Sequence, residues 1–150
     1  MQLRPPWTGR EDKLLDVCTR CGACIGACPT KLLVEGHGGY PIVDFTHGAT
    51  CTFCGACADA CEDDCFHRTT GPAWGLKAAL SPACIELKGV ICRRCEEACD
   101  LAAIRFRPRI GGSAVPVIDA QLCNGCGACV PPCPVNALSI VNRESVEASA

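Results

Sequence analysis

The chain has 150 residues, a formal net charge of −2 and seventeen cysteines. That charge favours neither nucleic acid nor an anionic membrane surface as a partner, and no uncharged apolar stretch approaches the ~18 residues of a membrane span. The N-terminus lacks the apolar core of a secretory signal, and tight C-x2-C pairs suit metal or redox chemistry in a reducing compartment. We therefore expect a cytoplasmic protein and not a secreted disulfide framework.

The cysteines fall into groups of four that point to metal clusters. The groups are Cys18, Cys21, Cys24 and Cys28; Cys51, Cys54, Cys57 and Cys61; Cys84, Cys92, Cys95 and Cys99; and Cys123, Cys126, Cys129 and Cys133. The first and last read C-x2-C-x2-C-x3-C-P, the run that holds [4Fe–4S] clusters. Three closely spaced cysteines can each reach a different iron of one cubane, and the fourth is expected to open the next helix and face a second cluster. The sequence therefore predicts four clusters.

Two alternatives accompany this prediction. Zinc also takes four thiolates, but it prefers two separated C-x2-C knuckles, and disulfides would need an oxidising compartment. The third group departs from the pattern, because seven residues separate its first two cysteines, which leaves the role of Cys84 open. Cys65 stands outside the groups; it is either a small buried hydrophobe or a spare ligand in place of Cys84.

The intervals between the groups indicate a duplication. Residues 31–45 and 103–119 both read as strand, glycine turn and strand, whereas the middle interval, with Gly71-Pro72, Trp74 and residues 76–80, reads as a loop with one helical turn. Pro-x-Trp landmarks end at Trp7 and Trp74, at similar distances before the first and third groups. We interpret the chain as two repeats, 5–70 and 72–142, each an α+β module with short helices, a β-hairpin and two cluster sites. Residues 143–150 read as a polar tail.

Each repeat resembles the bacterial two-cluster ferredoxin, and the whole chain is similar to the NapF family of ferredoxin-type accessory proteins of periplasmic nitrate reductase. The matching segments are Arg4–Trp7, Cys18–Cys21, Gly38–Pro41, Cys51–Cys54, Cys92–Cys95, Phe106–Pro108 and Gln121–Cys126. The resemblance implies a cytoplasmic protein with two tandem ferredoxin-like modules and four [4Fe–4S] clusters. It also implies a partner, the catalytic subunit of the reductase before its export.

The ferredoxin resemblance further implies an interleaved set of ligands. In the first repeat, Cys61 would complete the site of Cys18, Cys21 and Cys24, and Cys28 would complete the site of Cys51, Cys54 and Cys57. In the second repeat, Cys133 would complete the site of Cys84, Cys92 and Cys95, and Cys99 would complete the site of Cys123, Cys126 and Cys129.

Function divides into two hypotheses, and neither is enzymatic, since the sequence shows no nucleotide-binding glycine run, Walker A motif or nucleophile elbow. The first is a maturation protein that docks on an iron–sulfur enzyme; the second is an electron carrier that wires a reductant to a redox enzyme. Arg105, Arg107 and Arg109 alternate with apolar residues, so a strand would place them on one face. They form either a solvated face or a docking patch for an acidic partner.

Overall fold

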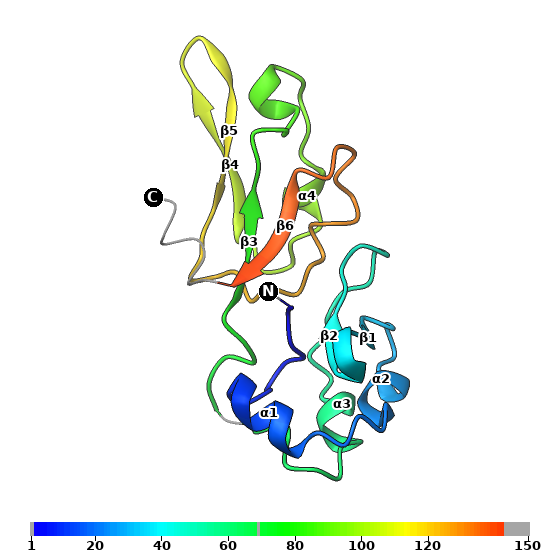
Figure 1. The fold of residues 1–150 in the computed structure, drawn as a ribbon. Helices are drawn as coiled ribbons and strands as arrows, with labels where there is room; N and C mark the ends of the chain where they lie inside the picture. Colours follow the sequence, from blue (N-terminus) through cyan, green and yellow to red (C-terminus); the bar gives the residue numbers. More distant parts are fainter. Residues whose placement is uncertain (1, 69, 143–150) are drawn as a thin grey trace. The chain divides into compact units, whose positions relative to one another are not determined.

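The computed structural model describes residues 2–68 and 70–142, which form two compact units. The first contains the described residues up to Asp44 together with Ala49–Trp74; the second contains Phe45–Gly48 and the described residues from Gly75 onward. The polar tail expected at 143–150 lies outside the described residues. Within the described ranges, no helix is long and apolar enough to cross a membrane. Short helices and two-stranded antiparallel sheets confirm the α+β class (Figure 1).

The first unit combines short helices with a hairpin. Its elements in chain order are α1 (Glu11–Val17), α2 (Ala23–Ala27), β1 (Leu33–Glu35), η1 (His37–Gly39), β2 (Pro41–Val43) and α3 (Ala56–Asp59). Strands β1 and β2 pair antiparallel, with Leu33 opposite Val43. Gly38 in the turn has a φ of 74°, a left-handed conformation that favours glycine. The hairpin expected over residues 31–45 is therefore present. Leu32, which directly precedes β1, is 1% exposed and belongs to the core.

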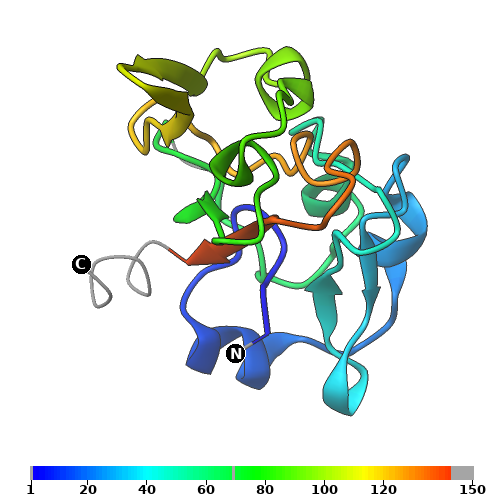
Figure 2. The ribbon, with the colours of Figure 1, turned by 90° about the horizontal axis from the view of Figure 1, so that it is seen from above.

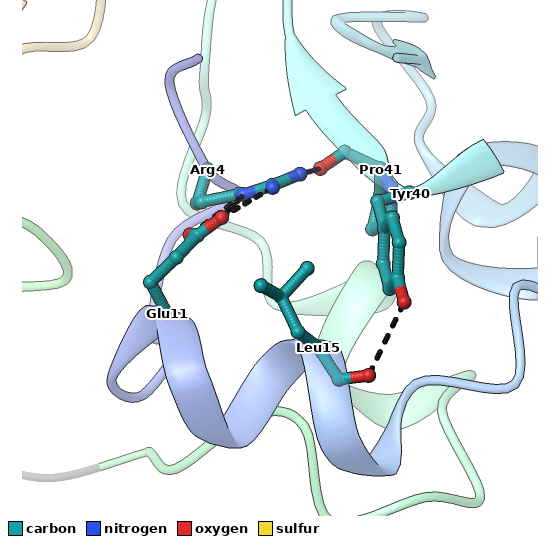
Figure 3. Close-up of polar contacts among 5 residues, drawn as sticks. All are labelled: Arg4, Glu11, Leu15, Tyr40 and Pro41. Carbon is teal, nitrogen blue, oxygen red and sulfur yellow. Dashed lines mark hydrogen bonds and ion pairs between the residues drawn. The ribbon is translucent and has the colours of Figure 1, made fainter. Parts of the chain in front are cut away.

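Arg4 ties the N-terminal segment to helix α1 and to the hairpin (Figure 3). Its guanidinium donates to the Glu11 carboxylate, from Nε at 2.8 Å, and to the Pro41 carbonyl oxygen at 3.1 Å. The Tyr40 hydroxyl donates to the Leu15 carbonyl oxygen at 3.2 Å, and the guanidinium lies 5.7 Å from the Tyr40 ring centroid. The hydrogen bond from Arg4 lowers the pKa of Glu11 against the opposing effect of its partial burial. These contacts join segments that are distant in sequence.

The second unit contains two pairs of strands. Its elements in chain order are β3 (Leu76–Leu80), η2 (Glu86–Lys88), α4 (Arg94–Glu97), β4 (Ile104–Arg109), β5 (Gly112–Ile118) and β6 (Leu138–Asn142). Strands β4 and β5 form the hairpin expected over residues 103–119, and both ribbon views show them side by side (Figures 1 and 2). Strand β3 pairs antiparallel with β6, from opposite ends of the unit's sequence.

The expectation of a loop with a helical turn at residues 76–80 is wrong, because this segment is strand β3. Its composition carries little strand signal, but its inward side chains Leu76 and Ala78 are buried and alternate with more exposed neighbours. The opposite strand β6 buries Leu138 and Ile140 in the same way. Pairing with a distant strand therefore decides the conformation, as is common where strand propensity is weak.

The expected position of the short helices is also wrong. The fourth cysteine of the first group does not open a helix: Cys28 is the C-terminal cap of α2, and the helix encloses the third cysteine, Cys24. The last group forms turns and no helix within the described residues. There, Pro131 and Pro132 stand where α2 has Gly26 and Ala27, and proline lacks the backbone N–H that a helix needs.

Candidate metal centres

The first unit contains a cavity lined by the sulfur-bearing residues of two separate groups. Cys18, Cys21 and Cys24 of the first group line it, together with Cys61, the last cysteine of the second group. Cys65 lines the same cavity, so five thiols face one space. Asp63 joins the two cysteine loops at this cavity, because its carboxylate accepts a hydrogen bond from the Thr19 hydroxyl at 2.7 Å.

A second cavity in the same unit receives the complementary set. Cys51, Cys54 and Cys57 of the second group line it with Cys28, the last cysteine of the first group. Phe53 lines this cavity as well, and its ring contacts Trp7 and Trp74 edge to face, with centroids 6.5 and 5.6 Å apart. Thus Cys24 and Cys28 face different cavities although only three residues separate them. That these eight cysteines ligate two clusters stays a prediction.

The second unit brings cysteines together in two sets. Cys84 and Cys92 lie beside Cys95, and their thiolate charges add to burial in raising the pKa of Cys95 to about 11. Cys99 and Cys123 likewise lie beside Cys126, whose pKa is raised chiefly by burial.

The remaining two cysteines of the second unit are Cys129 and Cys133. Burial, followed by the charges of Cys123 and Cys126, raises the pKa of Cys129 to about 12. Cys133 accepts a hydrogen bond at Sγ from the Ala137 backbone N–H at 3.2 Å. Its assignment to the site of Cys84 stays a prediction, as do the other ligand assignments of this unit.

The close approach of backbone segments in the second unit depends on glycine. A Cβ on Gly125 would lie 2.5 Å from the Leu76 carbonyl oxygen of β3, and a Cβ on Gly127 would lie 2.3 Å from ring carbons of Phe45. Both glycines have positive φ, 75° and 85°. This approach lets the Ala78 N–H of β3 donate to the Cys123 sulfur at 3.4 Å.

The chemistry of the donor sets fits [4Fe–4S] clusters. Desolvation and mutual repulsion hold thiols such as Cys24, Cys51 and Cys129 in their neutral forms, with pKa values raised to about 11, 11 and 12. A cationic iron core offsets both effects, because it binds the thiolate form. Backbone N–H groups also point at cluster-facing sulfurs, at 3.4 Å from Phe53 to Cys51 and 3.3 Å from Ala103 to Cys99. Such hydrogen bonds tune cluster potentials.

Cys28 differs from the other buried thiols. Burial acts to raise its pKa, but the Thr30 hydroxyl and the backbone N–H groups of Thr30, Leu32 and Leu33 outweigh this effect, so the pKa is lowered. The Thr30 hydroxyl lies 3.6 Å from the Cys28 sulfur. The loop after the cysteine therefore favours the charged form that a metal requires.

Sequence reasoning missed one further residue at these sites. Glu86, in the long insertion between Cys84 and Cys92, is 2% exposed, and its carboxylate accepts a hydrogen bond from the Cys92 backbone N–H at 2.6 Å. The unusual spacing was the available signal, since an insertion between two predicted ligands must fold back on itself to bring them together.

Comparison with known families defines the class of the protein. Residues 17–66 and residues 89–137 each match a family described as a 4Fe-4S dicluster domain. Two such domains account for four [4Fe–4S] clusters per chain. The fold and the cysteine sites therefore define a tandem ferredoxin-type iron–sulfur protein.

Relatives narrow this class further. The chain is 47% identical over 137 residues to the ferredoxin-type protein NapF of Escherichia coli, an alignment that covers 91% of the chain and 83% of that relative. It is 45% identical over 138 residues to NapF of Haemophilus influenzae, covering 92% and 78%. A weaker similarity, 28% over 176 residues, joins it to the methylamine utilization ferredoxin-type protein MauM of Methylorubrum extorquens, covering 95% and 73%. The chain belongs to the NapF family of ferredoxin-type proteins.

Proposed function

We propose that the chain assists maturation of the catalytic subunit of periplasmic nitrate reductase in the cytoplasm, before that subunit is exported. It would insert clusters or set their redox state. The similarity to NapF over 91% of the chain carries this proposal, because the NapF resemblance implies this partner. Cys21 and Cys54 add support: each lines one cavity of the first unit and is itself exposed, so a partner thiol could reach a cluster bound at either site.

The docking surface that we propose is the arginine row of Arg105, Arg107 and Arg109. All three are exposed on β4, and Ile104 and Phe106, which alternate with Arg105 and Arg107, are 2% and 8% exposed. The packed part of the strand therefore presents Arg105 and Arg107, and Arg109 follows a shift in the strand register. The Arg105 Nε donates to the Ala102 carbonyl oxygen at 3.3 Å, which limits its freedom. Guanidinium groups in a row suit bidentate pairing with carboxylates of an acidic partner surface.

Neighbouring Arg93 is engaged within the unit. Its guanidinium lies 4.6 Å from the Phe106 ring centroid, and its Nη1 lies 3.4 Å from a carboxylate oxygen of Glu96. The Glu96 carboxylate also accepts a hydrogen bond from the Phe106 N–H at 3.3 Å. Arg93 is therefore held against Phe106 of β4 within the unit, and the docking surface that we propose consists of the arginine row.

The test is binding to the unexported reductase subunit at low and high salt, with all three arginines of the row changed to Gln. Affinity should weaken and lose much of its salt dependence, because exposed interface charges act chiefly on the rate of encounter. Iron content should stay unchanged, since no arginine ligates a cluster. The control is Arg10→Gln, an exposed arginine paired with Asp12 outside the row. Unchanged affinity at both salt concentrations would rule out this surface.

The second candidate function is electron transfer through several clusters. The observation that favours it is the interleaving of cysteines in the first unit, where Cys24 and Cys28 line different cavities from one short segment. Two clusters so held would be close enough to pass electrons. A maturation protein should lose its clusters to an apo-partner, whereas a carrier should keep them through repeated reduction and oxidation; iron analysis of both proteins after mixing separates the two functions.

A further inference from the structure

The position four residues after the last cysteine of each group adjoins a cluster site. The residues there are all buried: Leu32, Cys65, Ala103 and Ala137 are 1%, 3%, 1% and 2% exposed. In the groups ending at Cys99 and Cys133, the N–H of this residue donates to the sulfur of that last cysteine. Three of the groups have an apolar side chain at this position, namely Leu32, Ala103 or Ala137. The group ending at Cys61 has a thiol there, that of Cys65.

The thiol of Cys65 lies beside a predicted ligand. The ligand atoms of Cys61, Asp63 and Cys65 lie within 4.8 Å of one another, and Cys65 lines the cavity that also receives Cys18, Cys21 and Cys24. The Asp63 carboxylate is engaged by the hydroxyl of Thr19, and the Asp63 carbonyl oxygen accepts from the Cys65 N–H at 2.8 Å. The loop thus turns Cys65 inward, at the sulfur of Cys61.

We propose that Cys65 is a reserve ligand for the cluster held by Cys18, Cys21, Cys24 and Cys61, able to replace Cys61 on its iron. In the exchange, the Cys65 thiol gives its proton to solvent and its sulfur bonds to iron. The bond from iron to the Cys61 sulfur breaks, and that sulfur takes up a proton. No electron is gained or lost. This inference does not depend on the proposed maturation role, since it concerns one cluster and its own protein ligands.

The alternative is that Cys65 only packs in the apolar core, as Leu32 and Ala103 do. The structure supplies a suitable substitution to separate the two, because Ala already occupies the same position in both groups of the second unit, at Ala103 and Ala137. Cys65→Ala should therefore fold and hold the full iron content. It removes only the thiol.

The experiment measures iron and sulfide per chain after anaerobic reconstitution of the full chain. Cys61→Ala should retain about sixteen irons, four cubanes' worth, because Cys65 takes the vacated iron. Cys61→Ala combined with Cys65→Ala should fall to about twelve or fewer, one cubane or more lost. Cys28→Ala is the matched control. Its iron content should fall to the same level without a second substitution, since the residue four positions after Cys28 is Leu32, which cannot bind iron.

Each outcome decides the proposal. Loss of iron in Cys61→Ala alone, equal to the loss in the double variant, would overturn it. Retention of all iron by the double variant would also overturn it, because another group such as Asp63 would then be the substitute. Electron paramagnetic resonance of the Cys61→Ala protein provides a second readout: a reserve ligand predicts a [4Fe–4S] signal from the altered site in the reduced protein, and a [3Fe–4S] signal in the oxidised protein contradicts it.

Discussion

Removing the Glu86 carboxylate should loosen one cluster selectively. Glu86 lies in the insertion between Cys84 and Cys92 and accepts the Cys92 N–H at 2.6 Å from a position 2% exposed to solvent. Glu86→Ala leaves that N–H in a part-buried site without its acceptor. An orphaned buried donor costs about 1–3 kcal/mol, and the lost side-chain packing adds to it.

The magnitude follows from this cost. A local opening that becomes about 2 kcal/mol easier is populated about 30-fold more often, at 1.4 kcal/mol for each factor of ten. Release of iron from this site to a chelator should accelerate by the same factor. Glu86→Gln keeps an acceptor oxygen and nearly the same volume, so its release rate should stay within about fivefold of the unchanged protein.

The assay is anaerobic transfer of iron to a coloured chelator, followed over time. The phase assigned to the site of Cys92 should accelerate, while the others keep their rates. Glu97→Ala is the control, because Glu97 is an exposed glutamate of the nearby helix α4. Equal rates for the Glu86→Ala and Glu97→Ala proteins would show that the Glu86 carboxylate does not hold this site; a Glu86→Gln rate as fast as that of Glu86→Ala would show that charge matters and the acceptor does not.

Three other outcomes are expected. Anaerobically purified protein should be brown and contain about sixteen irons and sixteen sulfides per chain; a colourless protein with stoichiometric zinc would contradict this. Cys24→Ala should remove amide-exchange protection throughout residues 5–70 and spare 72–142, since ligand binding stabilises folding; uniform loss across both repeats would indicate one cooperative unit. Iron uptake by the apo-protein should become more favourable from about pH 6 to about pH 9, because burial raises the pKa of thiols such as Cys24 and Cys129 and binding must release their protons; uptake independent of pH would contradict it.

Local patterns in the sequence were sufficient to predict the two hairpins. The strand, glycine turn and strand of residues 31–45 become β1 and β2, and residues 103–119 become β4 and β5. Both depend on short-range turn chemistry, which a sequence displays directly. Strand β3 was missed because its partner β6 begins 62 positions after β3 does, from Leu76 to Leu138, and its own residues do not favour a strand.

The tertiary positions of two residues at the sites, Glu86 and Cys65, could not be predicted from the sequence, for a different reason. A glutamate in an insertion is usually solvated, and Glu86 is buried only because the loop folds back to place its carboxylate at the Cys92 N–H. The sequence suggests Cys65 as a substitute for Cys84 only because it is the one cysteine outside the four groups. The structure places it at the cavity of Cys61 instead. In both cases the partner is set by tertiary placement, which spacing between cysteines does not report.

The interleaving of cysteines in the first unit bears on how that unit is stabilised. Its apolar core is small, centred on side chains such as Leu14 and Leu32, and a domain of ~60 residues needs additional cross-links. Because Cys28 faces the cavity of the second group and Cys61 faces that of the first, each cluster would bridge both cysteine loops. Loss of either cluster then releases both loops at once. We infer that the two clusters of the first unit form one folding unit, and that their donation would proceed as a pair.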